Sequence, residues 1–303
     1  MDKAKNQDLR SNIAFVIQHI PGGALLFAAM SLIVLGYFGW YYYGADHLDQ
    51  ALYSLQLEKL TVTPQPAWIK TNVAHEVYNN SRLDRISLLD PRATSTVAQA
   101  FEAHEWVKTT QRVNKTVGGK VVVELVYRRP AAMIFVTSLD SATGKEKPGF
   151  LPIDNEGTLL PSEPHFSPDD VWNYFQIFAQ DAQPAGRLGM PFGDVRIMEA
   201  LNLCEFLDKY REPLGLAFIE VYQDNLASGP SPWVLHAFTR DKRREIIWGH
   251  APRLESNGEL PADEKLKRLV SWMERPLSAE STQTLTLDLR YSSSMTPVST
   301  RRD

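Results

Sequence analysis

The sequence predicts an α+β protein in which one membrane-spanning helix precedes strand-rich domains outside the membrane. Three observations lead to this prediction. The 20 residues 24–43 are uncharged and mainly apolar. Several later segments alternate apolar and polar residues, as half-buried strands do, and others repeat apolar residues at helical spacing. The 303 residues correspond to about two domains of ordinary size.

The composition excludes several classes of protein. Hydrophobic residues make up 44% and charged residues 22%, which is close to the globular average and argues against wholesale disorder. The 17 Gly and 19 Pro follow no period, so the chain is not collagen-like. The one cysteine, Cys204, provides neither an intramolecular disulfide nor a Cys-rich zinc site. A net charge of −4 gives no general electrostatic basis for binding nucleic acid.

The segment 24–43 has the length and composition of a transmembrane helix. About 20 helical residues cross the roughly 30 Å hydrocarbon layer, and a helix leaves no backbone group unpaired there. The longer run 11–45 contains no Asp, Glu, Lys or Arg. Because Trp and Tyr favour the headgroup level, we expect aromatic residues at the outer end to anchor the helix. They are Tyr37, Trp40, Tyr41, Tyr42 and Tyr43.

The charges beside this segment predict its orientation. The tail 1–23 carries three basic residues, whereas the linker 44–56 carries Asp46 and Asp49 and no Lys or Arg. The positive-inside rule therefore places the N-terminus in the cytoplasm and the C-terminal mass outside. A cleaved signal peptide is the main alternative, but its apolar core is usually about 7–15 residues and ends at small residues. A buried core helix is the other alternative, and the segment lacks the amphipathic stripe of one.

The first extracytoplasmic part, 57–129, has the element order strand, helix, helix, strand, strand. Its strands are predicted from alternation and its helices from spacing. Pro64 and Pro66 end the first strand, and the pair Gly118–Gly119 forms the turn between the last two. The expected elements are strand 57–62, helix 67–78, helix 91–104, strand 107–114 and strand 120–128.

The second part, 130–291, is predicted to be rich in strands with helices inserted. Residues 161–193 are rich in Pro, Gly and Asp, and we interpret them as a long insertion. The residues 292–303 lack periodicity and are expected to be a disordered tail. The expected strands are 132–137, 149–153, 158–160, 216–222, 233–238, 245–248 and 284–291, and the expected helices are 195–207 and 262–273.

The final strand, 284–291, shows the clearest alternation in the chain. One face carries Leu285, Leu287, Leu289 and Tyr291, and the other carries polar and charged residues. A terminal strand of this kind packs its apolar face on the core and can leave its backbone groups at the edge of the sheet. A partner segment can add there as another strand, with main-chain hydrogen bonds giving affinity.

The order of these elements resembles the FtsQ/DivIB family of bacterial cell-division proteins, which have a short cytoplasmic tail, one membrane helix, a POTRA domain and a β-domain. The resemblance covers most of residues 24–291. Five motifs of the family occur in the right order behind the predicted helix. They are Trp106–Val107 at the start of a strand, the strand and exit 121–130, the turn 153–157, Gly249 with the helix start 264–269, and the closing sequence 287–291.

The resemblance implies a POTRA domain at 57–129 and a β-domain at 130–291 that ends in an edge strand. It implies a non-catalytic scaffold of cell division, held in the cell inner membrane, which binds FtsB/FtsL-like single-pass coiled-coil proteins and helps control septum formation. Arg290 would offer a fork for a carboxylate and Tyr291 a rigid aromatic anchor. With Thr286 and Asp288 from the polar face, these are the expected partner-binding residues. No cofactor, metal or small-molecule substrate is implied.

The motifs of enzymes are incomplete in this chain. His75–Glu76 and His104–Glu105 lack the second histidine of a metalloprotease helix, and Gly144–Lys145 lacks the earlier glycine of a phosphate-binding loop. Cys204 lies on the apolar side of a predicted helix, where a thiol is inert. We therefore expect no enzyme. Two non-catalytic alternatives stay open, namely a POTRA-bearing transport component and a generic single-pass envelope receptor or regulator.

Overall fold

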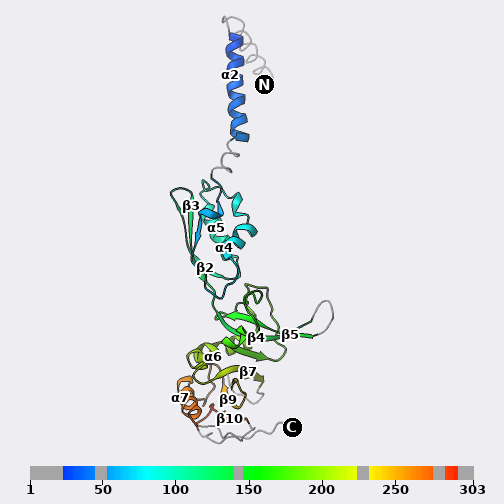
Figure 1. Cartoon of the computed structure of the whole chain (residues 1–303), viewed down its shortest axis with the longest axis vertical. Coiled ribbons are helices and arrows are strands. Elements are labelled where there is room, and N and C mark those ends of the chain that lie inside the picture. Colours follow the sequence, from blue (N-terminus) through cyan, green and yellow to red (C-terminus); the bar gives the residue numbers. More distant parts are fainter. Residues whose placement is uncertain (1–22, 45–52, 140–145, 224–231, 276–283, 293–303) are drawn as a thin grey trace, which may run out of the picture. The chain divides into compact units, whose positions relative to one another are not determined.

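A computed structural model describes residues 23–44, 53–139, 146–223, 232–275 and 284–292 (Figure 1). It confirms a mixed α/β chain with one long apolar helix near the N-terminus. The chain divides into two compact units. One comprises Met1–Thr61, Tyr78–Val97 and Val113–Val122, and the other Val62–Val77, Ala98–Arg112 and Val123–Asp303. The predicted tails 1–23 and 292–303 and the linker 44–56 lie largely outside the described residues.

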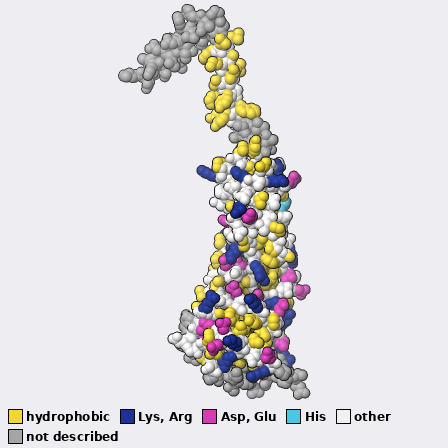
Figure 2. Space-filling view, turned by 90° about the vertical axis from the view of Figure 1, so that its left-hand side faces the viewer, with side chains coloured by type: hydrophobic (Ala, Val, Ile, Leu, Met, Phe, Trp, Pro, Cys, Tyr) yellow, Lys and Arg dark blue, Asp and Glu magenta, His cyan; other side chains and the backbone are white. Residues whose placement is uncertain are grey.

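The predicted membrane helix is confirmed as a helix. Helix α2 runs Gly23–Gly39 and continues as a π-helical turn, Trp40–Gly44. Over Leu25–Tyr42 it is long and apolar enough to cross a membrane, the only such helix among the described residues. Its apolar side chains are exposed, as the hydrophobic surface in Figure 2 shows. No other part of the described chain covers them.

A three-stranded sheet and two helices follow α2. The strands are β1 (Leu60–Val62), β2 (Val107–Thr116) and β3 (Lys120–Tyr127), in the order β1-β3-β2. The helices α4 (Val73–Asn80) and α5 (Ala93–Glu102) lie between β1 and β2 in the sequence. The predicted element order is therefore confirmed.

The largest differences from the predicted boundaries in this region lie at the starts of β1 and α4. Leu57–Lys59 is a 3₁₀ turn rather than strand. The helix expected at 67–78 begins only at Val73, because the Gln65 side chain organises a turn before it. The Gln65 amide nitrogen donates to the carbonyls of Ile69 (3.0 Å) and Thr71 (2.6 Å), and its oxygen accepts from the Val73 N–H (3.3 Å). These side-chain bonds replace the backbone bonds of a helix.

A seven-stranded mixed sheet forms the second half of the chain. Its order is β10-β9-β8-β7-β6-β4-β5. The pairs β4–β6, β6–β7 and β9–β10 are parallel and the others antiparallel. Over the described residues, β5 and β10 are therefore the two edges. The strands are β4 (Pro130–Leu139), β5 (Glu146–Asp154), β6 (Phe175–Ala179), β7 (Leu216–Gln223), β8 (Trp233–Thr239), β9 (Arg244–Gly249) and β10 (Leu285–Asp288).

The main core lies on one face of this sheet, beneath helices α6 (Val195–Arg211) and α7 (Ala262–Met273). Alternate residues of each strand point into it, for example Ile246 and Trp248 of β9. The opposite face carries a row of phenylalanines on neighbouring strands, with ring centroids 5.2–6.1 Å apart: Phe150, Phe135, Phe178 and Phe218. Residues of β10 therefore alternate between the helix-covered face and the aromatic face.

Three predictions in this part were wrong. The expected strand 158–160 forms only isolated bridges, from Leu159 to Ile153 and from Thr158 to Pro191. The insertion 161–193 contains a central strand, β6, which the sequence pattern did not indicate. The closing strand ends at Asp288 rather than at residue 291. It ends there because the Asp288 carboxylate accepts the Arg290 N–H at 2.9 Å, which turns the chain.

Candidate partner-binding edge

Strand β10 joins the sheet through β9 alone, in parallel register, with Leu287 opposite Ile246. The Leu285 N–H donates to the Arg243 carbonyl (2.9 Å) and the Leu289 N–H to the Ile247 carbonyl (3.0 Å). The backbone of every second residue therefore points toward β9, and the backbone of Thr286 and Asp288 points the other way. On that side the described sheet has no further strand. The geometry can accept a strand of another chain.

The edge has a defined end. After Asp288, the Arg290 carbonyl accepts the Leu260 N–H at 2.8 Å. The segment before α7 thus occupies the outward-facing carbonyl that would otherwise continue the edge. A strand added to β10 would pair with the backbone of Thr286 and Asp288 and would stop before Arg290.

Thr286 has a buried side chain. Its hydroxyl donates to Glu245 Oε2 (3.1 Å), and Glu245 Oε1 lies 2.8 Å from Nδ1 of His236. These residues form a polar row across β8, β9 and β10 on the aromatic face of the sheet. Thr286, predicted as a partner-binding residue, therefore presents its backbone rather than its side chain at the edge.

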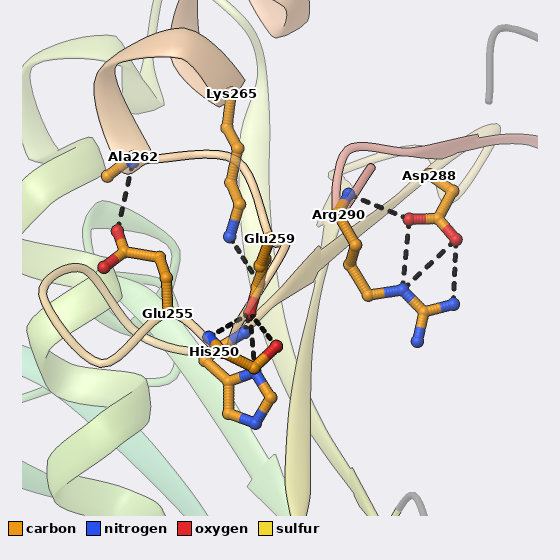
Figure 3. A network of polar contacts seen from close by, with 8 residues as sticks. His250, Glu255, Glu259, Ala262, Lys265, Asp288 and Arg290 are labelled. Atoms are coloured by element: carbon orange, nitrogen blue, oxygen red, sulfur yellow. Dashed lines mark hydrogen bonds and ion pairs between the residues drawn. The ribbon is translucent and has the colours of Figure 1, made fainter. Parts of the chain in front are cut away.

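Asp288 and Arg290 pair with each other. Arg290 Nε lies 3.1 Å from Asp288 Oδ1, and Arg290 Nη2 lies 2.8 Å from Asp288 Oδ2 (Figure 3). The Arg290 side chain is only 24% exposed and the Asp288 side chain only 16%. Two parallel charge-assisted bonds of this kind hold both groups firmly. The guanidinium fork, predicted to take a partner's carboxylate, is thus engaged by the carboxylate of Asp288, two residues earlier in the chain.

Tyr291 is the most exposed of the four predicted partner-binding residues, at 44%. The Arg290 guanidinium lies 5.6 Å from its ring centroid. Arg268 of α7 donates to the carbonyls of Tyr291 and Ser292, each at 2.9 Å. The backbone here is held, while the Tyr291 side chain stays accessible. Tyr291 is consequently the residue of this group whose side chain is best placed to meet a partner.

A buried ion pair lies next to the end of the edge. Lys265 of α7 and Glu259 have side chains 0% and 1% exposed, and Lys265 Nζ lies 2.5 Å from Glu259 Oε1 (Figure 3). Nζ also lies 5.3 Å from the centroid of the buried Trp248 ring. A buried pair loses stability sharply when one partner is removed, because the other charge stays behind without compensation.

The Glu259 carboxylate accepts hydrogen bonds from His250 and Ser256 as well as from Lys265. The backbone N–H of His250 (2.9 Å) and of Ser256 (2.9 Å) both donate to it, as does the Ser256 hydroxyl (3.0 Å). His250 Nδ1 lies 2.7 Å from Oε2. Burial alone raises the pKa of Glu259, but the hydrogen bonds from Lys265, Ser256 and His250 outweigh it and hold the pKa below its usual value. Burial lowers the pKa of Lys265 although Glu259 opposes this.

Gly249 separates Glu259 from Arg290. Its φ of +91° lies in the left-handed region that favours glycine. A Cβ on Gly249 would lie 2.0 Å from Glu259 Oε1 and 2.9 Å from Arg290 Cγ. Only a residue without a side chain lets both groups approach the backbone. The glycine at the end of β9 therefore allows the buried carboxylate and the edge arginine to pack on either side of it.

The remaining predicted residues lie apart from this edge. Tyr37 is part of α2, and Trp40, Tyr41, Tyr42 and Tyr43 lie in the π-helical turn that continues it. The Tyr37 and Tyr41 rings stack with centroids 6.3 Å apart. Cys204 is buried in the core, and burial raises the pKa of its thiol. Among the described residues, no group of three or more His, Cys, Asp or Glu is placed to hold a metal ion.

Sequence reasoning did not identify His250 or Glu259. Both lie between β9 and α7, where the sequence has no periodicity. Lys265 was noted only as part of a helix motif, and nothing in the sequence predicts that it is buried. The available signal was Gly249, because a glycine at the end of a strand often allows close approach of another group.

The comparisons with known proteins do not assign a family. The chain matches no protein-family model and is similar to no curated protein.

Proposed function

We propose that this chain is a non-catalytic scaffold of bacterial cell division, with a POTRA domain at 57–129 and a β-domain at 130–291. In this proposal α2 anchors the chain in the cell inner membrane, with the N-terminus in the cytoplasm and the C-terminal domains outside. An FtsB/FtsL-like single-pass coiled-coil protein adds a strand to β10, and this contact helps control septal wall synthesis.

The observation that carries the proposal is the outer side of β10. Its outward-facing backbone at Thr286 and Asp288 meets no further strand of the described sheet. Edge strands that serve no partner are usually blocked by prolines, bulges or covering segments. β10 contains no proline and continues the parallel register of β9 without a bulge. The resemblance of the sequence to FtsQ/DivIB supports the choice of partner, and the apolar α2 supports the location.

The test is photocrosslinking in living cells from the full-length chain. A photoreactive phenylalanine replaces Tyr291, an exposed aromatic residue that tolerates a similar ring. The same probe at the exposed Lys147 of β5 is the matched control, because it lies on the opposite edge of the same sheet. We expect position 291 to capture a small single-pass coiled-coil protein and position 147 not to capture it.

The identity of the captured protein, read by mass spectrometry, decides between the two functions. Equal capture from both positions would contradict a binding site at β10. Capture from position 291 of an envelope protein that lacks a coiled coil would favour the generic receptor instead.

Arg290→Glu gives a second test. It places two carboxylates where Arg290 and Asp288 now pair. Their mutual repulsion should displace the chain at the end of β10. We expect partner affinity to fall by about tenfold, with stability lowered by about 1 kcal/mol. A titration of the full chain in nanodiscs measures the first and thermal unfolding the second. Unchanged affinity would show that the Arg290 end of β10 is outside the interface.

A further inference from the structure

We infer that the buried Lys265–Glu259 pair is a positioning device for β10, and that it fixes where the partner-binding edge ends. This inference rests on the proposed function for its biological meaning, but its structural content does not depend on the identity of the partner. The two side chains are almost fully buried, and neither residue lies in the strand itself. Their effect passes through two neighbours, Leu260 and Gly249.

The first connection runs through Leu260. Glu259 is held by donors from three places in the chain, namely Lys265 in α7, Ser256 in the preceding turn and His250 after β9. With its carboxylate fixed, the next residue has little freedom. The Leu260 N–H then meets the Arg290 carbonyl at 2.8 Å. That bond occupies the first outward-facing carbonyl beyond β10 and so closes the edge after Asp288.

The second connection runs through Gly249. Glu259 Oε1 and Arg290 Cγ both approach the position where a Gly249 Cβ would lie, at 2.0 Å and 2.9 Å. The aliphatic part of Arg290 therefore packs against the backbone of Gly249, while the carboxylate lies against the same residue. Movement of Glu259 would release both the Leu260 bond and the packing of Arg290. Arg290 would then no longer hold Asp288 in its present place.

Simple core packing does not explain this pair. Two buried charges can often be replaced by apolar or neutral residues of similar size with little loss of stability. Stability alone therefore gives no reason to bury Lys265 beneath Trp248. The Glu259 carboxylate is contacted by five nitrogen and hydroxyl groups of Lys265, His250 and Ser256. Such a network holds its segment in one position, which an apolar side chain would not do. The geometry fits a role in specifying position.

The experiment removes both charges together. The full chain carrying Glu259→Gln and Lys265→Met is placed in nanodiscs and compared with wild type by hydrogen exchange and mass spectrometry. We expect a similar unfolding temperature, but exchange about tenfold faster in the peptide 284–292. The peptide that contains Leu160, at the other edge of the sheet, should be unchanged. The matched control is Glu264→Gln with Lys267→Met, which alters two exposed residues of the same helix.

A milder variant covers the case in which the double variant does not fold. Ser256→Ala removes only the 3.0 Å hydroxyl bond to Glu259. It should speed exchange in 284–292 by about threefold, as expected for the loss of one hydrogen bond. Faster exchange confined to this peptide supports the inference, and exchange equal to wild type in a folded variant overturns it.

Crosslinking from position 291 separates this inference from the proposed function. If the pair positions the edge, capture should fall about tenfold or more in the double variant, although the protein is folded. A wild-type chain that captures nothing would remove the proposed function, while the exchange result would still decide whether the pair positions β10. A folded double variant with wild-type exchange would remove the inference and leave the proposed function untouched.

Discussion

The two edges of the seven-stranded sheet, β5 and β10, differ in how far their outward-facing N–H and C=O groups are covered or missing. At β5, the Leu160 N–H donates to the Pro152 carbonyl at 2.9 Å, which places the backbone of Pro152 on the outer side. By alternation, Phe150 and Pro148 also point outward. Two of these three positions therefore lack an N–H. The segment around Leu159 covers the C-terminal half of the strand.

In the part of the chain that the structure describes, β10 contains no proline and pairs with no strand on its outer side. Its outward-facing residues, Thr286 and Asp288, both carry an N–H. Beyond its far end, Leu260 donates its N–H to the carbonyl of Arg290. Prolines and covering segments are the usual protection of an exposed edge. The same sheet thus blocks one edge and limits the other to a short segment, which is the arrangement expected if only β10 receives a partner.

The largest predicted effect concerns the glycines near these edges. Gly249→Ala should lower the free energy of unfolding by about 3 kcal/mol or more, because the new Cβ meets Glu259 and the φ of +91° is strained for alanine. Gly149→Ala on β5 should leave stability unchanged or raise it by about 0.5 kcal/mol, because nothing lies within 4 Å of its Cβ position. Chemical denaturation of both variants measures the difference.

Similar stability of the two glycine variants would contradict the packing of Glu259 and Arg290 against Gly249. A useful third variant is Gly249→Ala combined with Glu259→Ala. It removes the carboxylate that the new methyl group meets, so its stability should depend less on the added Cβ. Hydrogen exchange in 284–292 would show whether the strand β10 is then released.

The second-largest effect is expected when a proline, which protects the outer side of β5, is placed in β10. Thr286→Pro removes an outward-facing N–H without deleting a ladder bond to β9, as Pro148 and Pro152 do at β5. It also deletes the Thr286–Glu245 bond. We expect partner affinity to fall by about 100-fold, or close to 3 kcal/mol. Thr286→Val is the matched control, because it loses the hydroxyl but keeps the N–H, and it should bind within about threefold of wild type.

Affinity of Thr286→Pro equal to that of Thr286→Val would show that the partner does not use the backbone of β10. The reciprocal change, Pro148→Ala, restores one N–H at β5. Capture from position 147 should nevertheless stay absent, since the rest of that edge remains covered by Leu159 and lacks the N–H of residue 152.

The elements with strong periodicity could be predicted from the sequence. Helix α7 occupies the residues expected for it, 262–273, because its apolar residues recur at helical spacing. β6 could not be predicted in the same way. Phe175–Ala179 lies in the middle of the sheet and pairs in parallel with β4 and β7. Its first three residues are all buried and the other two half-buried, so no alternation of exposed and buried residues marks it. The Pro- and Gly-rich residues around it indicated an irregular insertion more strongly than a strand.

The candidate site was predictable only in part. The alternation of residues 284–291 indicated a terminal strand, and the structure places β10 at an edge. The early end of that strand depends on one side-chain bond, from Asp288 to the Arg290 N–H, which competes with the strand pattern. The Glu259–Lys265 pair joins residues from a loop and a helix with no shared pattern. Tertiary packing alone brings these charges together.

The smallest predicted effect is the response of the two edges to acid. The pKa of Glu259 in the folded chain lies below its ordinary value of 4.5. In the unfolded chain this carboxylate takes up its proton first as the pH falls, so its contribution to stability is complete above 4.5 and declines as the pH falls through the folded pKa. Protection of the Leu289 amide should therefore decrease in this range more than that of Leu160, which faces no such pair.

Hydrogen exchange corrected for intrinsic rates at each pH measures this difference, and Glu259→Gln provides the control. Because an amide does not titrate, the extra loss of protection at Leu289 should disappear in that variant. A loss that persists in Glu259→Gln would show that the acid response of β10 does not come from Glu259. The buried pair beneath β10 would then not be needed to distinguish this edge from β5.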